Sequence, residues 1–230
     1  WLPQTNHDIN FILKSYSTEL KGLRNNVDLV VGGPPCQGFS SAGKRNEQDD
    51  RNKLIDSYIK FIRIVQPKII FFENVKGFTE KFDRNKIKGR IYSKYVTEAL
   101  ERNVQDCPGY NVFGQLINFA DYGVPQKRTR FLLFGIRKNI TRSSKPQLFF
   151  EQLRANRESF LVSNGISMTT TLEEAISDLL YSHGQVDSPD SIGFKAGIYG
   201  NIQSKYQNYM RSQNVNSIPD SHRFSNHQET

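Results

Sequence analysis

Two residues far apart in the sequence, Cys36 and Glu73, have side chains suited to covalent and acid–base chemistry. Cys36 lies within Gly-Pro-Pro-Cys-Gln-Gly-Phe-Ser at residues 33–40. A cysteine at the rim of a cleft is a nucleophile when nearby positive charge favours the thiolate. Glu73 directly follows the apolar run 69–72, where a carboxyl group could hold or deliver a proton. Alone, each has a commoner explanation, because a lone cysteine is usually an apolar filler and a lone glutamate usually lies at the surface.

A third segment is basic and contains Lys127, Arg128 and Arg130. Such a run usually forms a solvated loop. Its planar guanidinium groups could instead bind a phosphate or a carbonyl oxygen.

The elements that must position these residues follow an α/β pattern, because short β-rich runs alternate with helical periodicity. Helix 52–66 has apolar residues at three- and four-residue steps. The pattern predicts strands at 27–31, 69–72, 112–118 and 131–136, and helices at 52–66 and 91–103.

These elements predict where the reactive residues meet. Ligands in open α/β sheets collect beyond the carboxyl ends of parallel strands. Cys36 and Glu73 each lie just past such a strand, and the basic segment follows a third. If strand 131–136 runs back antiparallel, the basic segment stays on the same edge. We therefore expect a thiol, a carboxyl group and two guanidinium groups to converge.

The composition and the residue pattern of the chain change after about residue 142. We therefore expect a core at 1–145 and an irregular extension at 146–230. Within the extension, the spacing of Thr171 and Glu174 predicts a capping box and a short helix through Leu180. Residues 182–230 are rich in Asn, Ser, Gln and Gly and show no strong periodicity.

Composition limits the partners and the compartment. The net charge of +8 favours a polyanion, nucleic acid first. The only two cysteines, Cys36 and Cys107, exclude a disulfide scaffold and a thiolate zinc cluster and suit a reducing compartment. Cys107 has no partner pattern, so we expect it to be an apolar filler. The apolar runs are too short to span a bilayer, and we expect a cytoplasmic protein.

The three segments together resemble the DNA cytosine-5 methyltransferases of the bacterial restriction–modification or orphan type. The likeness rests on the segment at 33–40, on Glu73-Asn74-Val75 and on Gln-Lys-Arg-Thr-Arg at 126–130, in this order. It covers roughly residues 8–180. The resemblance implies a doubly wound, mostly parallel sheet with one antiparallel strand, the Rossmann-like fold of enzymes that use S-adenosyl-L-methionine.

The resemblance also implies a mechanism on flipped-out cytosine in double-stranded DNA. Cys36 adds to C6 of the ring, which activates C5 for methyl transfer. Glu73 stabilises protonation at N3 and holds the exocyclic amine. Arg130 binds the O2 carbonyl, and Arg128 supports the loop or a phosphate.

By the same resemblance, the Pro35 carbonyl contacts the cytosine amine, and residues 39–52 form a loop that closes over DNA. The expected substrate-binding residues are Pro35, Gln37, Ser40, Lys44, Arg51 and Asn74, with Asp8, Ile9 and Leu54 expected at the cofactor. Asp8 has an alternative reading as a helix N-cap, and Leu54 also belongs to the apolar stripe of its helix.

The sequence departs from the family at both ends. It has no Phe-x-Gly-x-Gly turn for the cofactor and no Gly-Asn-Ser-Val-like segment. We expect the chain to be either a piece of a longer, monomeric enzyme or one subunit of a split enzyme. By the same resemblance, we expect the extension at 146–230 to lead toward a target-recognition domain outside this sequence. The isolated stretch should then bind the cofactor weakly and be inactive.

Three alternatives stay open. A tRNA cytosine-5 methyltransferase of the same family would carry a Cys-Phe-Thr tripeptide, which this sequence does not contain. A non-catalytic DNA-binding relative would be expected to have lost the cysteine or the glutamate. A cysteine-dependent hydrolase would need a well-placed histidine, and all four histidines lie outside the motifs.

Overall fold

The computed structural model describes residues 2, 5–35, 53–81, 91–104, 106–140, 144–212, 218–219 and 222–225. The chain forms two compact units. The first, here the sheet unit, comprises Trp1–Ile117 and Thr129–Arg154, and the second unit comprises Asn118–Arg128 and Ala155–Thr230. The boundary expected at residue 145 differs, since the basic connection before Thr129 groups with the later part of the chain.

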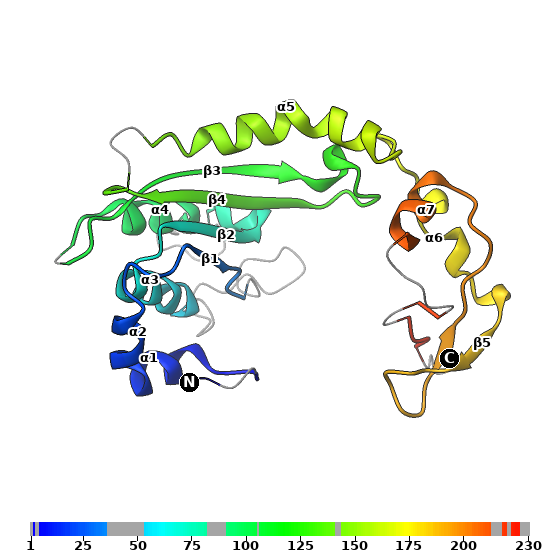
Figure 1. Ribbon diagram of the computed structural model, residues 1–230, viewed down its shortest axis with the longest axis horizontal. Coiled ribbons are helices and arrows are strands. Elements are labelled where there is room, and N and C mark those ends of the chain that lie inside the picture. The colour runs from blue at the N-terminus through cyan, green and yellow to red at the C-terminus, as the bar shows by residue number, and fades with distance from the viewer. Residues whose placement is uncertain are drawn as a thin grey trace. The chain divides into compact units, whose positions relative to one another are not determined.

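The sheet unit is built on four strands in the order β1-β2-β4-β3. β1 pairs parallel with β2, and β4 pairs antiparallel with β2. The β3 and β4 arrows point in opposite directions in Figure 1. Among the described strands of this sheet, β4 is therefore the antiparallel one, and the predicted sheet is confirmed. The strands are β1 (Leu29–Gly32), β2 (Ile69–Val75), β3 (Tyr110–Asn118) and β4 (Thr129–Arg137).

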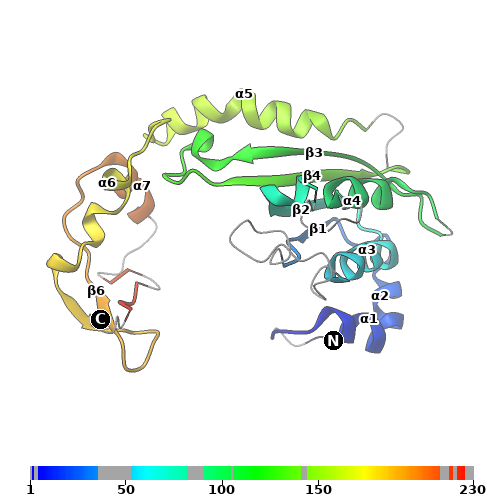
Figure 2. The same ribbon diagram turned by 180° about the vertical axis from the view of Figure 1, so that it is seen from behind.

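Helices cover both faces of this sheet, as Figures 1 and 2 show. On one face, α3 and α4 bury their apolar stripes against Phe72 and Leu133. On the other, Phe149 of α5 stacks on Phe134, with ring centroids 4.5 Å apart. The helices of this unit are α1 (Ile9–Ser15), α2 (Ser17–Gly22), α3 (Lys53–Val65), α4 (Tyr92–Glu101) and the first turns of α5 (Gln147–Ser163).

Local differences from the sequence prediction have physical causes. β2 continues to Val75 instead of ending before Glu73, because residues 73–75 pair with β4. The expected loop after it begins with the 3-10 helix η2 (Lys76–Thr79), whose Phe78 is fully buried. Cys107 is buried in the core of the sheet unit, so its role as an apolar filler is confirmed.

The expectation of irregular structure over 146–230 is wrong. The apolar residues of α5 come as adjacent runs at 148–150 and 160–162, which hides their helical period. The predicted capping box at Thr171 and Glu174 is present. The second unit contains 3-10 helices η3 (Phe119–Tyr122), η4 (Ser177–Leu179) and η5 (Tyr181–His183), strands β5 (Gln185–Asp187) and β6 (Lys195–Gly197), and helices α6 (Leu172–Ile176) and α7 (Lys205–Arg211).

Among the described helices, none has the length and apolar character needed to cross a lipid bilayer.

A glycine fixes the connection between β3 and β4. Gly123 ends η3 with φ +80°, in the left-handed region. A Cβ atom there would come within 2.6 Å of a methyl group of Leu161 and within 3.2 Å of Ile166. The glycine therefore allows both the turn and its close packing on the end of α5.

We predict that Gly123→Ala lowers the free energy of unfolding by about 2–4 kcal/mol, from backbone strain and overpacking together. The matched control is Gly165→Ala, because Gly165 also has positive φ but no atom near its Cβ position. The control should cost only about 1–2 kcal/mol. Urea unfolding measures both, and equal losses would show that the contact with Leu161 is unimportant.

Candidate active site

The centre of the candidate site is an ion pair at one edge of the sheet. The Nε atom of Arg130 lies 2.8 Å from Oε1 of Glu73. Glu73 lies on β2 opposite Leu132, and Arg130 lies opposite Val75, so the two charged residues are diagonal neighbours on the same face. The Arg130 side chain is 15% exposed and that of Glu73 is 39% exposed. The pair is thus partly shielded yet open to a ligand.

The orientation of Arg130 is fixed by a second contact. Its Nη1 atom donates a hydrogen bond to the carbonyl oxygen of Thr129 at 3.0 Å. A guanidinium group carries five N–H donors, so others remain to bind a carbonyl oxygen.

The second oxygen of Glu73 faces the segment that leads to Cys36. A Cβ atom at Gly33 would lie 3.3 Å from Oε2 of Glu73. The carboxylate therefore lies between the guanidinium group of Arg130 and the backbone of Gly33, three residues before Cys36 in the sequence.

Asn74, the next residue of β2, contacts the same segment from the buried side of the strand. It is only 1% exposed. Its Nδ2 atom donates to the carbonyl oxygen of Pro34 at 3.2 Å, and its Oδ1 atom accepts from the backbone N–H of Val75 at 2.9 Å. Both bonds are made to backbone, and the direct substrate contact expected of Asn74 stays a prediction.

Two of the three expected cofactor residues share a cavity with Pro35. This cavity has a volume of about 310 Å³ and lies between α1, β1 and α3. No charged residue lines it within the described part of the chain, so it suits a planar ring more than a charged group. Its lining residues are Ile9, Val30, Val31, Gly33, Pro34, Pro35, Leu54, Tyr58 and Phe61.

Asp8 is the N-cap residue of α1. Its carboxylate accepts a hydrogen bond from the backbone N–H of Phe11 at 2.9 Å, which caps the helix. The alternative reading of Asp8 as an N-cap is therefore confirmed, and the cavity wall beside it is formed by Ile9.

Arg128 lies in the second unit, whereas Arg130 lies in the sheet unit. Arg128 is exposed, and its carbonyl oxygen accepts from the backbone N–H of Phe119 at 3.0 Å. The ion pair with Glu73 involves Arg130.

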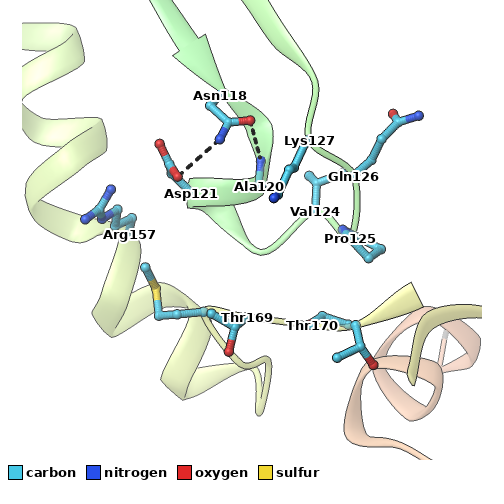
Figure 3. Close-up of a pocket in the computed structure, with 12 residues that line it drawn as sticks. Asn118, Ala120, Asp121, Val124, Pro125, Gln126, Lys127, Arg157, Thr169 and Thr170 are labelled. Carbon is cyan, nitrogen blue, oxygen red and sulfur yellow. Dashed lines mark hydrogen bonds between the residues drawn. The ribbon is translucent and has the colours of Figure 1, made fainter. Parts of the chain in front are cut away.

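The residues before Arg128 line an open cavity of about 510 Å³ in the second unit. Figure 3 shows the connection from Asn118 to Lys127 on one side of this cavity, with Arg157 and the threonines 169 and 170 across from it. The Nδ2 atom of Asn118 lies 3.4 Å from Oδ1 of Asp121. Lys127 and Arg157 bring positive charge to the cavity.

Five predicted site residues lie outside the described residues, so the structure does not test their placement. They are Cys36, Gln37, Ser40, Lys44 and Arg51.

The sequence prediction missed two residues at the site, Gly33 and Tyr58. The sequence indicates Gly33 only as part of the motif, because its position beside Glu73 depends on the register of β1 and β2. The helical periodicity of residues 52–66 places Tyr58 on the apolar stripe. It belongs to the core and also lines the cavity of Ile9 and Leu54, which helical periodicity alone cannot distinguish.

Comparison with known proteins gives one family. The family model described as C-5 cytosine-specific DNA methylase matches residues 3–229. The type II methyltransferase M.DdeI of Desulfomicrobium norvegicum is 34% identical over 187 residues, which are 78% of this chain and 40% of the relative. M.XorII of Xanthomonas oryzae pv. oryzae is 40% identical over 126 residues, 54% of this chain and 27% of the relative. The chain thus spans less than half of these relatives.

Among solved structures, the chain resembles one titled as a DNA modification methyltransferase encoded within an Escherichia coli prophage. The TM-score is 0.51 at 19% identity, over 86% of this chain and 47% of the other. At this identity the likeness supports the fold alone.

We predict that Glu73 and Arg130 stabilise the fold as a coupled pair. A double-mutant cycle with Glu73→Gln and Arg130→Gln, measured by urea unfolding, should give a coupling of about 1 kcal/mol. The control pair is Lys68 and Asp28, whose side chains are 50% and 81% exposed. It should couple by no more than about 0.5 kcal/mol. Additive effects of the two site substitutions would argue against the ion pair.

Proposed function

The chain belongs to the C-5 cytosine-specific DNA methylases, and we propose that it forms the catalytic core of a DNA cytosine-5 methyltransferase. Its substrate is a cytosine flipped out of double-stranded DNA, and its methyl donor is S-adenosyl-L-methionine. The observation that carries this proposal is the pairing of Glu73 with Arg130 against the segment that leads to Cys36.

The chemistry requires a nucleophile because C5 of cytosine is a weak nucleophile by itself. The Cys36 thiolate adds to C6, and the electron pair released into the ring makes C5 reactive. When bound, the cofactor supplies the methyl group that C5 takes. Loss of the C5 proton then re-forms the ring double bond and expels the thiolate, so the nucleophile is restored.

Glu73 and Arg130 lower the cost of this addition by holding the ring at two polar positions. The carboxylate of Glu73 stabilises a proton at N3, which withdraws charge from the ring as the thiolate attacks. A free N–H of Arg130 donates to the O2 carbonyl. Groups fixed in advance in a partly shielded site stabilise the developing charge without reorganising during the reaction.

The target base must leave the helix to reach these groups, at a cost of a few kcal/mol. The net charge of +8 supports binding to the DNA backbone. Lys44, Arg51 and Arg128 are candidates for phosphate contacts, and Gln37 and Ser40 are candidates for contacts with the target nucleotide.

The cavity lined by Ile9, Leu54 and Pro35 is the candidate position for the adenine ring of the cofactor. Its apolar walls suit the two faces of a purine. Pro35 is next to Cys36 in the sequence, which would bring the methyl donor and the nucleophile to the same segment. Residues 146–230 would then lead toward a target-recognition domain.

We predict that Cys36→Ser abolishes covalent trapping of the full protein on DNA that contains 5-fluorocytosine. With S-adenosyl-L-methionine present, C5 gains a methyl group, and fluorine cannot then leave C5 as a proton does, so the adduct of the wild-type protein should survive denaturing electrophoresis. Methyl transfer should fall more than about a thousandfold. Trapping by the serine variant would reject Cys36 as the nucleophile.

Cys107→Ser is the matched control, because Cys107 is the other cysteine and is buried in the core. It should trap DNA like the wild type.

Glu73→Gln should slow methyl transfer by about 10²–10⁴-fold, since an amide cannot take the place of the acid. A rate near that of the wild type would refute the role of Glu73.

We predict that Leu54→Ala weakens binding of S-adenosylhomocysteine to the full protein about tenfold, through lost apolar contact. Titration calorimetry measures this without turnover. Ile64→Ala is the control, because Ile64 lies on the same helix but packs against α1 and α2. Equal losses in both variants would mean that Leu54 acts through the fold and not through the cavity.

A further inference from the structure

The backbone ladder between β1 and β2 ends before the reactive segment begins. The last registered pair is Gly32 with Phe72. Two prolines follow soon after, Pro34 and Pro35, and proline has no N–H to donate to a ladder. The segment that leads to Cys36 therefore needs another attachment to the sheet.

The Asn74 side chain supplies that attachment. Its Nδ2 atom donates to the Pro34 carbonyl oxygen at 3.2 Å, past the end of the ladder. Its Oδ1 atom accepts from the backbone N–H of Val75 at 2.9 Å. This bond orients the side-chain amide so that its nitrogen points to Pro34. Because Asn74 is 1% exposed, losing either partner would leave a buried polar group unpaired, which is costly.

Side chains alternate along β2, so Glu73 and Asn74 lie on opposite faces of the strand. The two neighbours nevertheless contact one segment, since Oε2 of Glu73 faces Gly33 and Asn74 holds Pro34. One dipeptide of β2 thus presents the acid and also anchors the backbone two residues before Cys36.

We propose that Asn74 is a positioning residue that holds the Gly33–Pro34 backbone beside the Glu73 carboxylate, and that adduct formation by Cys36 depends on this attachment. This inference rests on the proposed function. It gives Asn74 a role different from the substrate contact expected from the sequence, because the side chain is 1% exposed and both of its polar atoms bind backbone. A misplacement of reacting groups by about 1 Å can lower a reaction rate about 10²-fold. The single buried hydrogen bond from Asn74 to Pro34 can therefore have a large effect on the rate of adduct formation.

The test uses Asn74→Asp in the full protein. The carboxylate keeps an acceptor for Val75 but loses the donor to Pro34. Single-turnover formation of the adduct with 5-fluorocytosine DNA, at saturating DNA, should slow by about 10–100-fold. The dissociation constant for the same DNA, measured by fluorescence anisotropy, should be unchanged. A weaker dissociation constant with a normal rate at saturation would overturn the proposal in favour of a substrate contact.

Two further variants separate positioning from general loss of structure. Asn74→Ser removes the long amide without adding charge and should show the same slow adduct formation, even if the aspartate variant fails to fold. Asn111→Asp removes a donor to Ser144 from β3, and should leave the adduct rate as in the wild type. Wild-type rates in both Asn74 variants would overturn the inference, whereas a wild-type protein that forms no adduct would overturn the proposed function itself.

Discussion

The register between β2 and β4 is the constraint on which the site depends. Val75 lies opposite Arg130, and Glu73 lies opposite Leu132. This pairing puts the carboxyl group and the guanidinium group on one face, 2.8 Å apart. A slip of one residue would turn Arg130 toward the buried face of the sheet. The aromatic contact of Phe71 and Phe134 with Phe149 of α5 opposes such a slip, because Phe71 lies on the same face of β2, two residues before Glu73.

The sequence predicted the convergence of Glu73 and Arg130 because strand ends follow simple rules. Apolar runs locate the strands, and parallel strands present their carboxyl ends at one edge. The antiparallel direction of β4, which keeps Arg130 at that edge, was a condition of the prediction and is observed. The placement of Cys36 lies outside the described residues, so its part in the convergence stays a prediction.

Other features could not be predicted, since they depend on contacts between distant residues. The hydrogen bond from Asn74 to Pro34 joins residues 40 apart and leaves no periodic signal. Helix α5 was missed because its apolar residues are adjacent and pack on both the sheet and Gly123. The assignment of residues 118–128 to the second unit depends on packing with α5 that a local pattern does not encode. The role of Asp8 could not be predicted from the sequence, because an aspartate that caps a helix and one that binds a ligand are the same residue type.

The most direct test is a structure of the full protein trapped on 5-fluorocytosine DNA. The account predicts a bond between the Cys36 sulfur and C6 of the extruded ring. Glu73 should then lie within hydrogen-bond distance of N3, and Arg130 of O2. A covalent adduct on another residue, or a trapped ring with Glu73 and Arg130 far from it, would contradict the account.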